Sequence, residues 1–299
     1  MMAVWQERWQ RWGLHALMGL MARLPLSVVR ALGWCLGWVL YAVVAPRRRV
    51  AMVNWAACFP ELSEAQRRRA VQRHFVYFAQ AWLDRGWLWG ADVTTVRQRL
   101  QLVGDVAAVQ GNTPTVLFAP HFVGMDAGWT ALTAHLPRRF CGIYAHQDNV
   151  VVDRWMEQGR QRFGQPHIVA KNDGLKPLAS ALRAGEPLYV LPDMDHGLGD
   201  SVFAPFFGVP AATLTSLPRF AKLGRAQVVP VTARLTATGY EVRIWPAWAN
   251  YPTGDVLADV TLSNQRLEAM IRTMPEQYYW VHKRFKTRPP GQPGLYQRR

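Results

Sequence analysis

The chain has 299 residues, half of them hydrophobic, and its 35 Lys and Arg against 20 Asp and Glu give a formal charge of +15. This length suffices for one large domain with an appendage, and the apolar fraction is enough for a buried core. Nucleic acid and anionic lipid both attract a basic chain, but the basic residues stand beside Trp, Leu and Val rather than in a recognisable nucleic-acid module. We therefore expect a membrane as a partner, and no nucleic acid.

Residues 1–50 are predicted to form a helical membrane anchor. Two apolar blocks, 14–29 and 31–45, lie in a stretch nearly free of acidic residues, and basic residues follow at 47–49. The second block runs for 15 residues without a charge, slightly short of the roughly 20 that a spanning helix needs. The pattern allows a spanning helix, a helix in the interface, or an amphipathic pair buried against the domain. A cleaved signal peptide is disfavoured, because arginines fall inside the region that should be apolar.

Residues 63–90 predict a long helix, with Ser63 as N-cap before Glu64 and apolar residues at helical spacing as far as Trp89. Its aromatic residues could line a groove for an acyl chain. Such a stripe is more often plain core, so the core interpretation is favoured. The three cysteines, Cys35, Cys58 and Cys141, have neither metal-ligand spacing nor an even-numbered framework, which indicates reduced thiols facing the cytoplasm.

Beyond residue 90, short apolar runs alternate with helical segments, which predicts an α/β fold with a mixed central sheet flanked by helices. Pro230 has no N–H, so it indicates that the strand 227–234 is an edge strand or carries a bulge. No linker divides residues 51–299, which we expect to form one domain. The expected strands are 100–103, 115–119, 139–144, 188–191, 227–234 and 240–245, and the expected helices are 127–136, 153–163, 176–184, 213–224 and 255–274.

A histidine and an aspartate follow the apolar strand 115–119, which Pro120 closes. His121 precedes Asp126 by five positions, at the carboxyl end of a strand, where ligands bind in open α/β sheets. Five helical steps would set the two residues about 140° apart, so they can meet only if His121 lies in the strand-to-helix turn. Asp126 could then accept from Nδ1 and leave Nε2 as a general base. The alternative is a histidine bonded under a loop and an aspartate placed by the helix dipole.

A second polar turn, DMDHGLG at 193–199, follows the strand 188–191. Asp193, Asp195 and the histidine that follows them, His196, suggest a metal site, but they also suit a loop that pairs with arginines. We favour the loop and predict no metal, because Mg²⁺ and Zn²⁺ sites need more ligands than a local pair of carboxylates.

Six segments, in order along the chain, carry a family resemblance. They are RRRVAMVNWAACFPELSEAQRR, APHFVGMD, DNVVVDRWMEQGRQRFG, LPDMDHG, FAPFFGVPAATLTSLPRFAKLGRAQVVPV and PEQYYWVHKRFKTRPPG. With them the chain resembles the late acyltransferases of lipid A biosynthesis, the lauroyl or myristoyl transferase type, within the HxxxxD glycerolipid acyltransferase superfamily. The four blocks of that superfamily correspond to HFVGMD, the Arg160 region, LPDMDHG and VVPV.

The resemblance implies a glycerolipid acyltransferase-like fold and transfer of a fatty acyl chain from acyl carrier protein to a hydroxyl of a lipid A precursor. The reaction would run at the cytoplasmic face of the inner membrane, with no metal or organic cofactor. His121, held by Asp126, would remove the proton from the acceptor hydroxyl. Arg160, with Arg154 as second choice, would stand near the oxyanion or the lipid phosphates.

The remaining site residues carried by the resemblance are expected to position rather than react. Asp193 and Asp195 would position such an arginine, and Phe206, Phe207 and Gly208 would shape the site. The basic runs at 67–69 and 283–288 could dock the acidic carrier protein or lipid, or be solvated faces near anionic lipid.

One departure affects the choice of acceptor. The late acyltransferases often have Glu where this chain has Asp126, whereas Asp is commoner in glycerophosphate and lysophospholipid acyltransferases. The alternative is therefore a lysophospholipid or aminolipid acyltransferase of the same superfamily. A non-catalytic membrane protein that binds lipid is the third interpretation.

Overall fold

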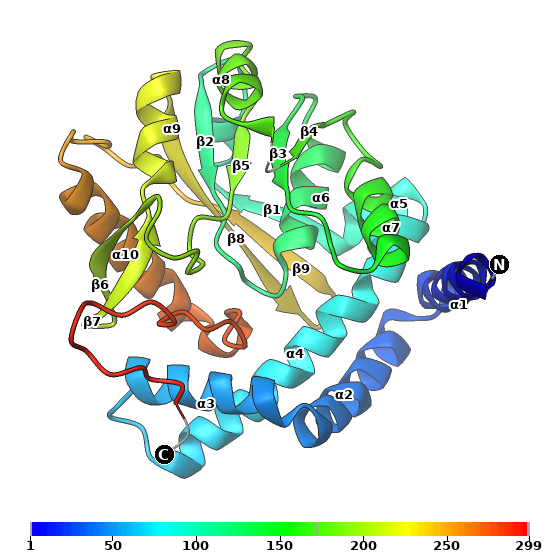
Figure 1. The fold of residues 1–299 in the computed structure, drawn as a ribbon. Coiled ribbons are helices and arrows are strands. Elements are labelled where there is room, and N and C mark those ends of the chain that lie inside the picture. Colours follow the sequence, from blue (N-terminus) through cyan, green and yellow to red (C-terminus); the bar gives the residue numbers. More distant parts are fainter. Residues whose placement is uncertain (1, 171–172, 298–299) are drawn as a thin grey trace.

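The computed structural model describes residues 2–170 and 173–297, so residue 1 of the expected anchor and residues 171–172 and 298–299 of the expected domain lie outside the description. A seven-stranded sheet in the order β1-β9-β8-β2-β5-β3-β4 forms its centre (Figure 1). All neighbouring strands run parallel except β8 and β9, which are antiparallel, so the sheet is mixed as predicted. The strands are β1 Leu100–Gly104, β2 Thr115–Phe118, β3 Cys141–Tyr144, β4 His167–Ala170, β5 Leu188–Val190, β8 Gln227–Thr236 and β9 Gly239–Ile244, with β6 Ser201–Phe206 and β7 Val209–Leu214 as a separate hairpin.

Helices cover both faces of the sheet and bury two apolar cores. Successive residues of β2 face opposite cores: Val116 and Phe118 join one cluster and Leu117 joins the other, as the two-residue period of a strand requires. The long helix α4 reaches both clusters, with Phe75 in the first and Trp87 in the second. The helices are α1 Met2–Arg23, α2 Leu26–Val43, α3 Ala45–Cys58, α4 Glu64–Gly90, α5 Val93–Arg99, α6 Met125–His135, α7 Val150–Arg160, α8 Lys176–Arg183, α9 Ser216–Gly224 and α10 Val256–Thr273, with short 3₁₀ helices at Val106–Val109 and Pro275–Gln277.

Helix α4 begins where the sequence predicts. Ser63 accepts from the Gln66 N–H, and the Gln66 side chain accepts from the Ser63 N–H, so both arms of a capping box are formed. Its aromatic stripe contributes to the cores rather than to a groove, as favoured from the pattern.

Two expectations about the sheet are wrong. Strand β8 lies inside the sheet, and Pro230 stands where its pairing changes: residues up to Pro230 pair with β2, and residues from Val231 onward pair with β9. The missing N–H therefore falls at a change of partner, not at an edge. The expected helix 213–224 starts later, because Val209–Leu214 turns back on β6 as a hairpin strand before α9 begins. Strand β4 carried no signal in the sequence.

The first two helices lie against the domain. Helix α2 runs alongside α4 (Figure 1), and it approaches so closely at Gly33 and Gly37 that a Cβ would come within 2.6 Å of Gln80 and 2.5 Å of Val76. Helix α1 packs on α4 as well, where a Cβ on Gly86 would meet Met21 at 2.5 Å. The division at residue 50 stays a prediction.

The outer faces of these helices are apolar and exposed. Leu26–Val43 is the one helix of the described chain that is long and apolar enough to cross a membrane, with a mean hydropathy of 1.6. Only 22% of it is buried. Large apolar side chains exposed on the two helices include Trp5, Trp9, Trp12, Leu17, Leu20, Val28, Leu32, Trp34, Trp38, Val39 and Val43. Exposing so much apolar surface to water is energetically unfavourable.

Candidate active site

His121 lies in the loop between β2 and α6, beyond the carboxyl end of a central strand. The C-terminal segment holds this loop, because Val123 N–H donates to Gln277 O at 2.8 Å and Tyr279 N–H donates to His121 O at 2.9 Å. Gly124 closes it as the N-cap of α6, where a Cβ would come within 2.7 Å of a main-chain oxygen of β8. The sequence therefore predicted the position of the histidine correctly.

The carboxylate of Asp193 holds both the ring and the main chain of His121. Its Oδ1 accepts from Nδ1 at 2.8 Å, and its Oδ2 accepts from the His121 N–H and from the Tyr278 hydroxyl, each at 3.0 Å. Since an ionised carboxylate can only accept, Nδ1 carries the proton and the lone pair of the neutral ring is on Nε2. The side chain of His121 is 21% exposed and that of Asp193 only 1%.

Asp193 stays ionised although it is buried. Burial raises the pKa of Asp193, but the neighbouring His121 and the hydrogen bonds from His121 and Tyr278 outweigh this and lower the pKa below its ordinary value. An ionised carboxylate at Nδ1 orients the imidazole and stabilises the imidazolium that forms when Nε2 takes a proton. The arrangement is that of a general base with its orienting partner.

A second histidine, His282, supports the turn that carries Asp193. The Asp195 N–H donates to His282 Nε2 at 3.1 Å, so this ring must be neutral at Nε2. Burial lowers the pKa of His282 to about 4, and the neighbouring His121 acts in the same direction. His282 is therefore an uncharged acceptor near neutral pH.

Asp126 lies in the first turn of α6, and two arginines hold its carboxylate. Arg85 of α4 donates from Nε to Oδ2 at 2.8 Å and places Nη2 at 2.7 Å from the same oxygen. Arg160, at the end of α7, donates from Nε to Oδ1 at 2.8 Å. Burial raises the pKa of Asp126, but Arg160 and Arg85 together lower it to about 2. The three side chains form a buried cluster with one anion and two cations.

The expected pairing of His121 with Asp126 is therefore corrected. Nδ1 of His121 is taken by Asp193, and both oxygens of Asp126 are taken by guanidiniums. The sheet register explains the choice, because Phe118 of β2 pairs with Val190 of β5. His121 and Asp193 each stand three residues beyond that pair, so parallel neighbouring strands bring them side by side.

The expectation that Asp193 and Asp195 would position an arginine is also wrong. The carboxylate of Asp195 accepts from the Thr287 N–H at 2.7 Å, from the Thr287 hydroxyl at 2.8 Å and from the Gly197 N–H at 3.0 Å. It thus ties the turn to the C-terminal segment. The carboxylate that holds arginines is that of Asp126, and the carboxylate that holds His121 is that of Asp193. The roles predicted for these two aspartates are therefore exchanged.

The two arginines named from the sequence, Arg160 and Arg154, have different partners in the structure. Arg160 is brought to Asp126, and its guanidinium lies over the Tyr144 ring at 5.3 Å. Arg154 is two-thirds exposed and pairs with Glu7 of α1 at 3.4 Å. The structure therefore separates the second choice from the cluster that holds the first.

Phe206 is the last residue of β6, and Phe207 and Gly208 form the turn of the β6–β7 hairpin. Phe206 is buried against the Tyr278 ring, at 6.3 Å between ring centroids, and Tyr278 in turn bonds Asp193. Phe207 and Gly208 both have a positive φ, of 51° and 74°, which suits a tight turn. The hairpin thus reaches Asp193 only through the Phe206–Tyr278 contact, and its role in shaping the site stays a prediction.

Sequence reasoning missed Arg85 and Tyr278. Arg85 stands in the apolar run WLDRGWLW of α4, where a charge on a buried helix signals a partner in the interior. Tyr278 belongs to PEQYYW, which carried no such signal. Both are reached only through contacts between segments far apart in the chain.

A group that could hold a metal ion lies elsewhere. Cys141, His167 and Glu186 have potential ligand atoms within 4.8 Å of one another. They stand at the amino ends of β3, β4 and β5, the edge opposite His121. Glu186 already bonds His167 at 3.2 Å and pairs with Arg139 at 3.5 Å, so the group is satisfied by internal contacts.

A mixed α/β sheet with a carboxylate-bound histidine beyond its central strand has the geometry that general acid–base catalysis requires. Comparison with known proteins then defines the class of protein. A family model described as bacterial lipid A biosynthesis acyltransferase matches residues 4–287. The chain therefore belongs to the bacterial lipid A biosynthesis acyltransferase family.

Individual relatives agree over most of their length. The chain is 30% identical to the lipid A biosynthesis lauroyltransferase of Escherichia coli strain K12, covering 96% of this chain and 95% of the relative. It is 33% identical to a lipid A biosynthesis acyltransferase of Haemophilus influenzae, over 96% and 90%, and 32% identical to the Escherichia coli myristoyltransferase, over 84% and 79%. Among solved structures, the 1-acyl-sn-glycerophosphate acyltransferase of Thermotoga maritima aligns with a TM-score of 0.38 and 14% identity, over 84% and 96%.

Proposed function

We propose that this protein transfers a fatty acyl chain from acyl carrier protein to a hydroxyl of a lipid A precursor, with His121 as general base. The observation that carries the proposal is the hydrogen bond from Nδ1 of His121 to the buried Asp193, which leaves Nε2 as the proton acceptor. Membership of the lipid A acyltransferase family supports the substrate class.

In the proposed reaction, Nε2 of His121 takes the proton of the acceptor hydroxyl as its oxygen attacks the thioester carbonyl. The imidazolium is stabilised by Asp193 through Nδ1–H. The tetrahedral intermediate then collapses, the carbon–sulfur bond breaks, and His121 returns the proton to the leaving thiolate. An ester and a free carrier thiol result, and the base is regenerated without a cofactor.

Arg160 is the proposed anion-binding group. Its Nε is committed to Asp126, which leaves the Nη groups of the planar guanidinium for an oxyanion or a lipid phosphate. Asp126 would then act through Arg160, by holding the guanidinium in one orientation, rather than through His121. Arg85 of α4 donates to the other carboxylate oxygen of Asp126.

The basic run at 67–69 is the better of the two docking surfaces for an acidic carrier protein. Arg68 and Arg69 are exposed, and Arg68 pairs only with the exposed Glu64, at 2.7 Å. In the run at 283–288, by contrast, Arg284 is 2% exposed and donates to Ala212 O at 2.7 Å, so it serves the interior.

We further propose that the protein lies on the cytoplasmic face of the inner membrane with α2 in the plane of the interface. A spanning α2 would place α1 on the far side of the bilayer from the domain. Yet α1 contacts α4 through Met21 and reaches α7 through Glu7, which pairs with Arg154. Arg30 of α2 also pairs with the fully buried Asp84 of α4 at 2.8 Å. These contacts support helices that rest in one leaflet on their exposed apolar faces.

A labelling experiment tests this placement. Gln10→Cys, made in a Cys35→Ser background, would carry the reporter thiol on α1, and a membrane-impermeant maleimide would be added to intact spheroplasts. We expect no labelling until the membranes are opened. Labelling of intact spheroplasts would show that α1 lies in the periplasm, and the in-plane placement would be abandoned.

The activity is tested with purified His121→Ala protein, acyl carrier protein loaded with a fatty acyl chain, and a lipid A precursor. We expect the wild type to form the ester and the variant to lose about 10²- to 10⁴-fold in rate. Circular dichroism provides the control for folding. A wild type that acylates a lysophospholipid or aminolipid instead would establish the alternative acceptor, and a wild type with no turnover on any acyl donor would establish a lipid-binding protein.

A further inference from the structure

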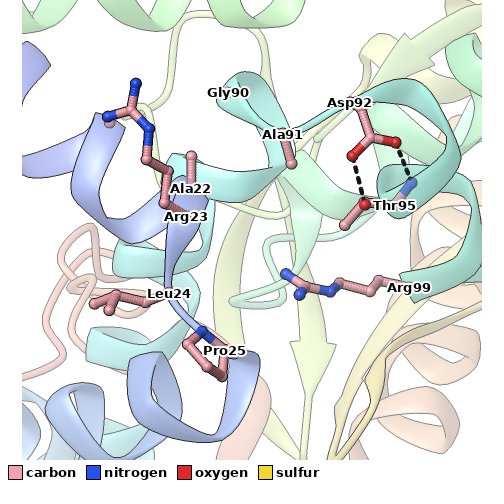
Figure 2. Close-up of a pocket in the computed structure, with 10 residues that line it drawn as sticks. Ala22, Arg23, Leu24, Pro25, Gly90, Ala91, Asp92, Thr95 and Arg99 are labelled. Carbon is pink, nitrogen blue, oxygen red and sulfur yellow. Dashed lines mark hydrogen bonds between the residues drawn. The ribbon is translucent and has the colours of Figure 1, made fainter.

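A pocket of about 520 Å³ lies at the elbow between α1 and α2, and its lining residues include none of the candidate catalytic residues. One wall comes from the elbow, with Gly19 and Pro25, and the other from the end of α4 and from α5, with Asp92 and Arg99 (Figure 2). Its volume is within the range of about 300–1,000 Å³ that small-molecule sites occupy.

The charges of the pocket favour an anion. Figure 2 shows the guanidinium of Arg99 extending across the pocket toward the elbow, while Arg23 stands at the opposite side with its guanidinium turned outward. Asp92 is the one carboxylate among the lining residues, and it is committed to α5, where it accepts from the Thr95 N–H at 2.9 Å and the Thr95 hydroxyl at 2.6 Å. The lining thus holds two arginines and one carboxylate, and that carboxylate already has its partners.

Arg99 has no carboxylate of its own. Burial raises the pKa of Asp84, and Arg30 and Arg99 both act to lower it, but the ion pair of Asp84 is with Arg30, at 2.8 Å. Within the described chain Nη1 of Arg99 is buried without a hydrogen-bond acceptor, and the contact recorded for the guanidinium is with the Trp87 ring, at 5.2 Å. Two cations thus share one carboxylate, and an anion in the pocket would offset the excess positive charge and accept hydrogen bonds from Arg99.

The location favours a lipid as the source of the anion. The elbow joins the two helices that expose apolar side chains, and Leu20 and Val28, on either side of it, are 51% and 41% exposed. If these faces rest in a leaflet, the pocket opens at the depth of the lipid headgroups. We propose that the elbow pocket binds the phosphate of an anionic phospholipid headgroup, through Arg99 with Arg23 at the rim.

The test measures binding, so it does not depend on acyl transfer. Calorimetry of the full-length protein with dihexanoylphosphatidylglycerol, a short lipid used as a monomer, avoids attraction to a charged vesicle surface. We expect saturable binding that Arg99→Gln weakens about tenfold and that Arg99→Lys partly restores. Gly19→Leu should weaken it similarly without removing a charge, because a Cβ at Gly19 has space and the longer side chain would fill the pocket.

Arg97→Gln is the matched control, since it removes the same charge from the same helix outside the pocket and should change the affinity about twofold or less. Inorganic phosphate is the second probe. If it binds as tightly as the lipid, the source is a free phosphate and the lipid assignment is overturned. Absence of binding by the wild type, or binding by Arg99→Gln and Gly19→Leu as tight as that of the wild type, would overturn the pocket itself.

Discussion

Two buried aspartates stand near the carboxyl edge of the central sheet, and they have opposite partners. Asp193 bonds a histidine ring that can gain and lose a proton, whereas Asp126 bonds two arginines that stay charged. Both carboxyl groups have a lowered pKa in spite of burial. The difference shows that a buried carboxylate gains its role from the group that balances it: one can orient a base, and the other can only hold cations in place.

The largest expected effect comes from Asp193→Asn. An amide can donate toward Nδ1 and so favours the wrong tautomer of His121, with the proton on Nε2, which we expect to lower kcat by about 10³- to 10⁴-fold. Steady-state assays with purified protein would measure this. Asp126→Asn should leave the pH dependence of the residual kcat unchanged. If Asp193→Asn keeps wild-type turnover while Asp126→Asn abolishes it, the roles assigned to the two aspartates are reversed.

Asp126→Asn should affect stability most. Removing the anion leaves Arg85 and Arg160 buried without their counter-charge, and the loss in unfolding free energy is expected to be about 3–5 kcal/mol. Urea denaturation followed by circular dichroism would measure it. Asp126→Glu, which keeps the charge, is the control and should lose less. Equal losses for the two variants would mean that side-chain length, rather than charge, decides the stability.

His282, which supports the turn that carries Asp193, should make the free energy of unfolding depend on pH. Burial lowers the pKa of His282 to about 4, so between pH 4 and its ordinary value of 6.5 the unfolded chain binds more protons than the folded one. The contribution of His282 to the free energy of unfolding is therefore fully present above pH 6.5. It falls as the pH drops toward 4, by up to about 3 kcal/mol. His74, whose pKa burial also lowers to about 4, acts in the same direction.

His282→Gln should flatten part of this slope, because the amide oxygen can still accept from the Asp195 N–H but does not titrate. Thermal unfolding between pH 4 and 7 would measure it, with the exposed His15→Gln as control. An unchanged slope in His282→Gln would place the acid sensitivity elsewhere.

The smallest effect sharpens the contrast between the two arginines named from the sequence. Arg160→Lys should reduce kcat/KM about tenfold to a hundredfold, since an ammonium cannot bond Asp126 and a substrate anion in one plane. Arg154→Lys, at an exposed site, should change it less than about twofold. Similar losses for both would indicate a general loss of positive charge rather than a positioned guanidinium.

Much of the local structure could be predicted from the sequence. The capping box at Ser63, the apolar runs of β2 and β5, and the position of His121 after β2 all depend on residues close in sequence. The exchange of Asp126 for Asp193 could not be predicted, because His121 and Asp193 are 72 residues apart and their meeting depends on the strand order. The place of Pro230 in an interior strand could not be predicted either, because it depends on which strands the two parts of β8 pair with.

The sequence by itself determined the family, the alternation of helices and strands, and a histidine at the end of a buried strand, because these follow from local patterns of polarity and spacing. Only the tertiary structure decided which carboxylate bonds His121, which arginine bonds Asp126, and that α1 and α2 rest on α4. These depend on sheet register and on close helix contacts such as Gly33 and Gly37, where segments far apart in the chain meet.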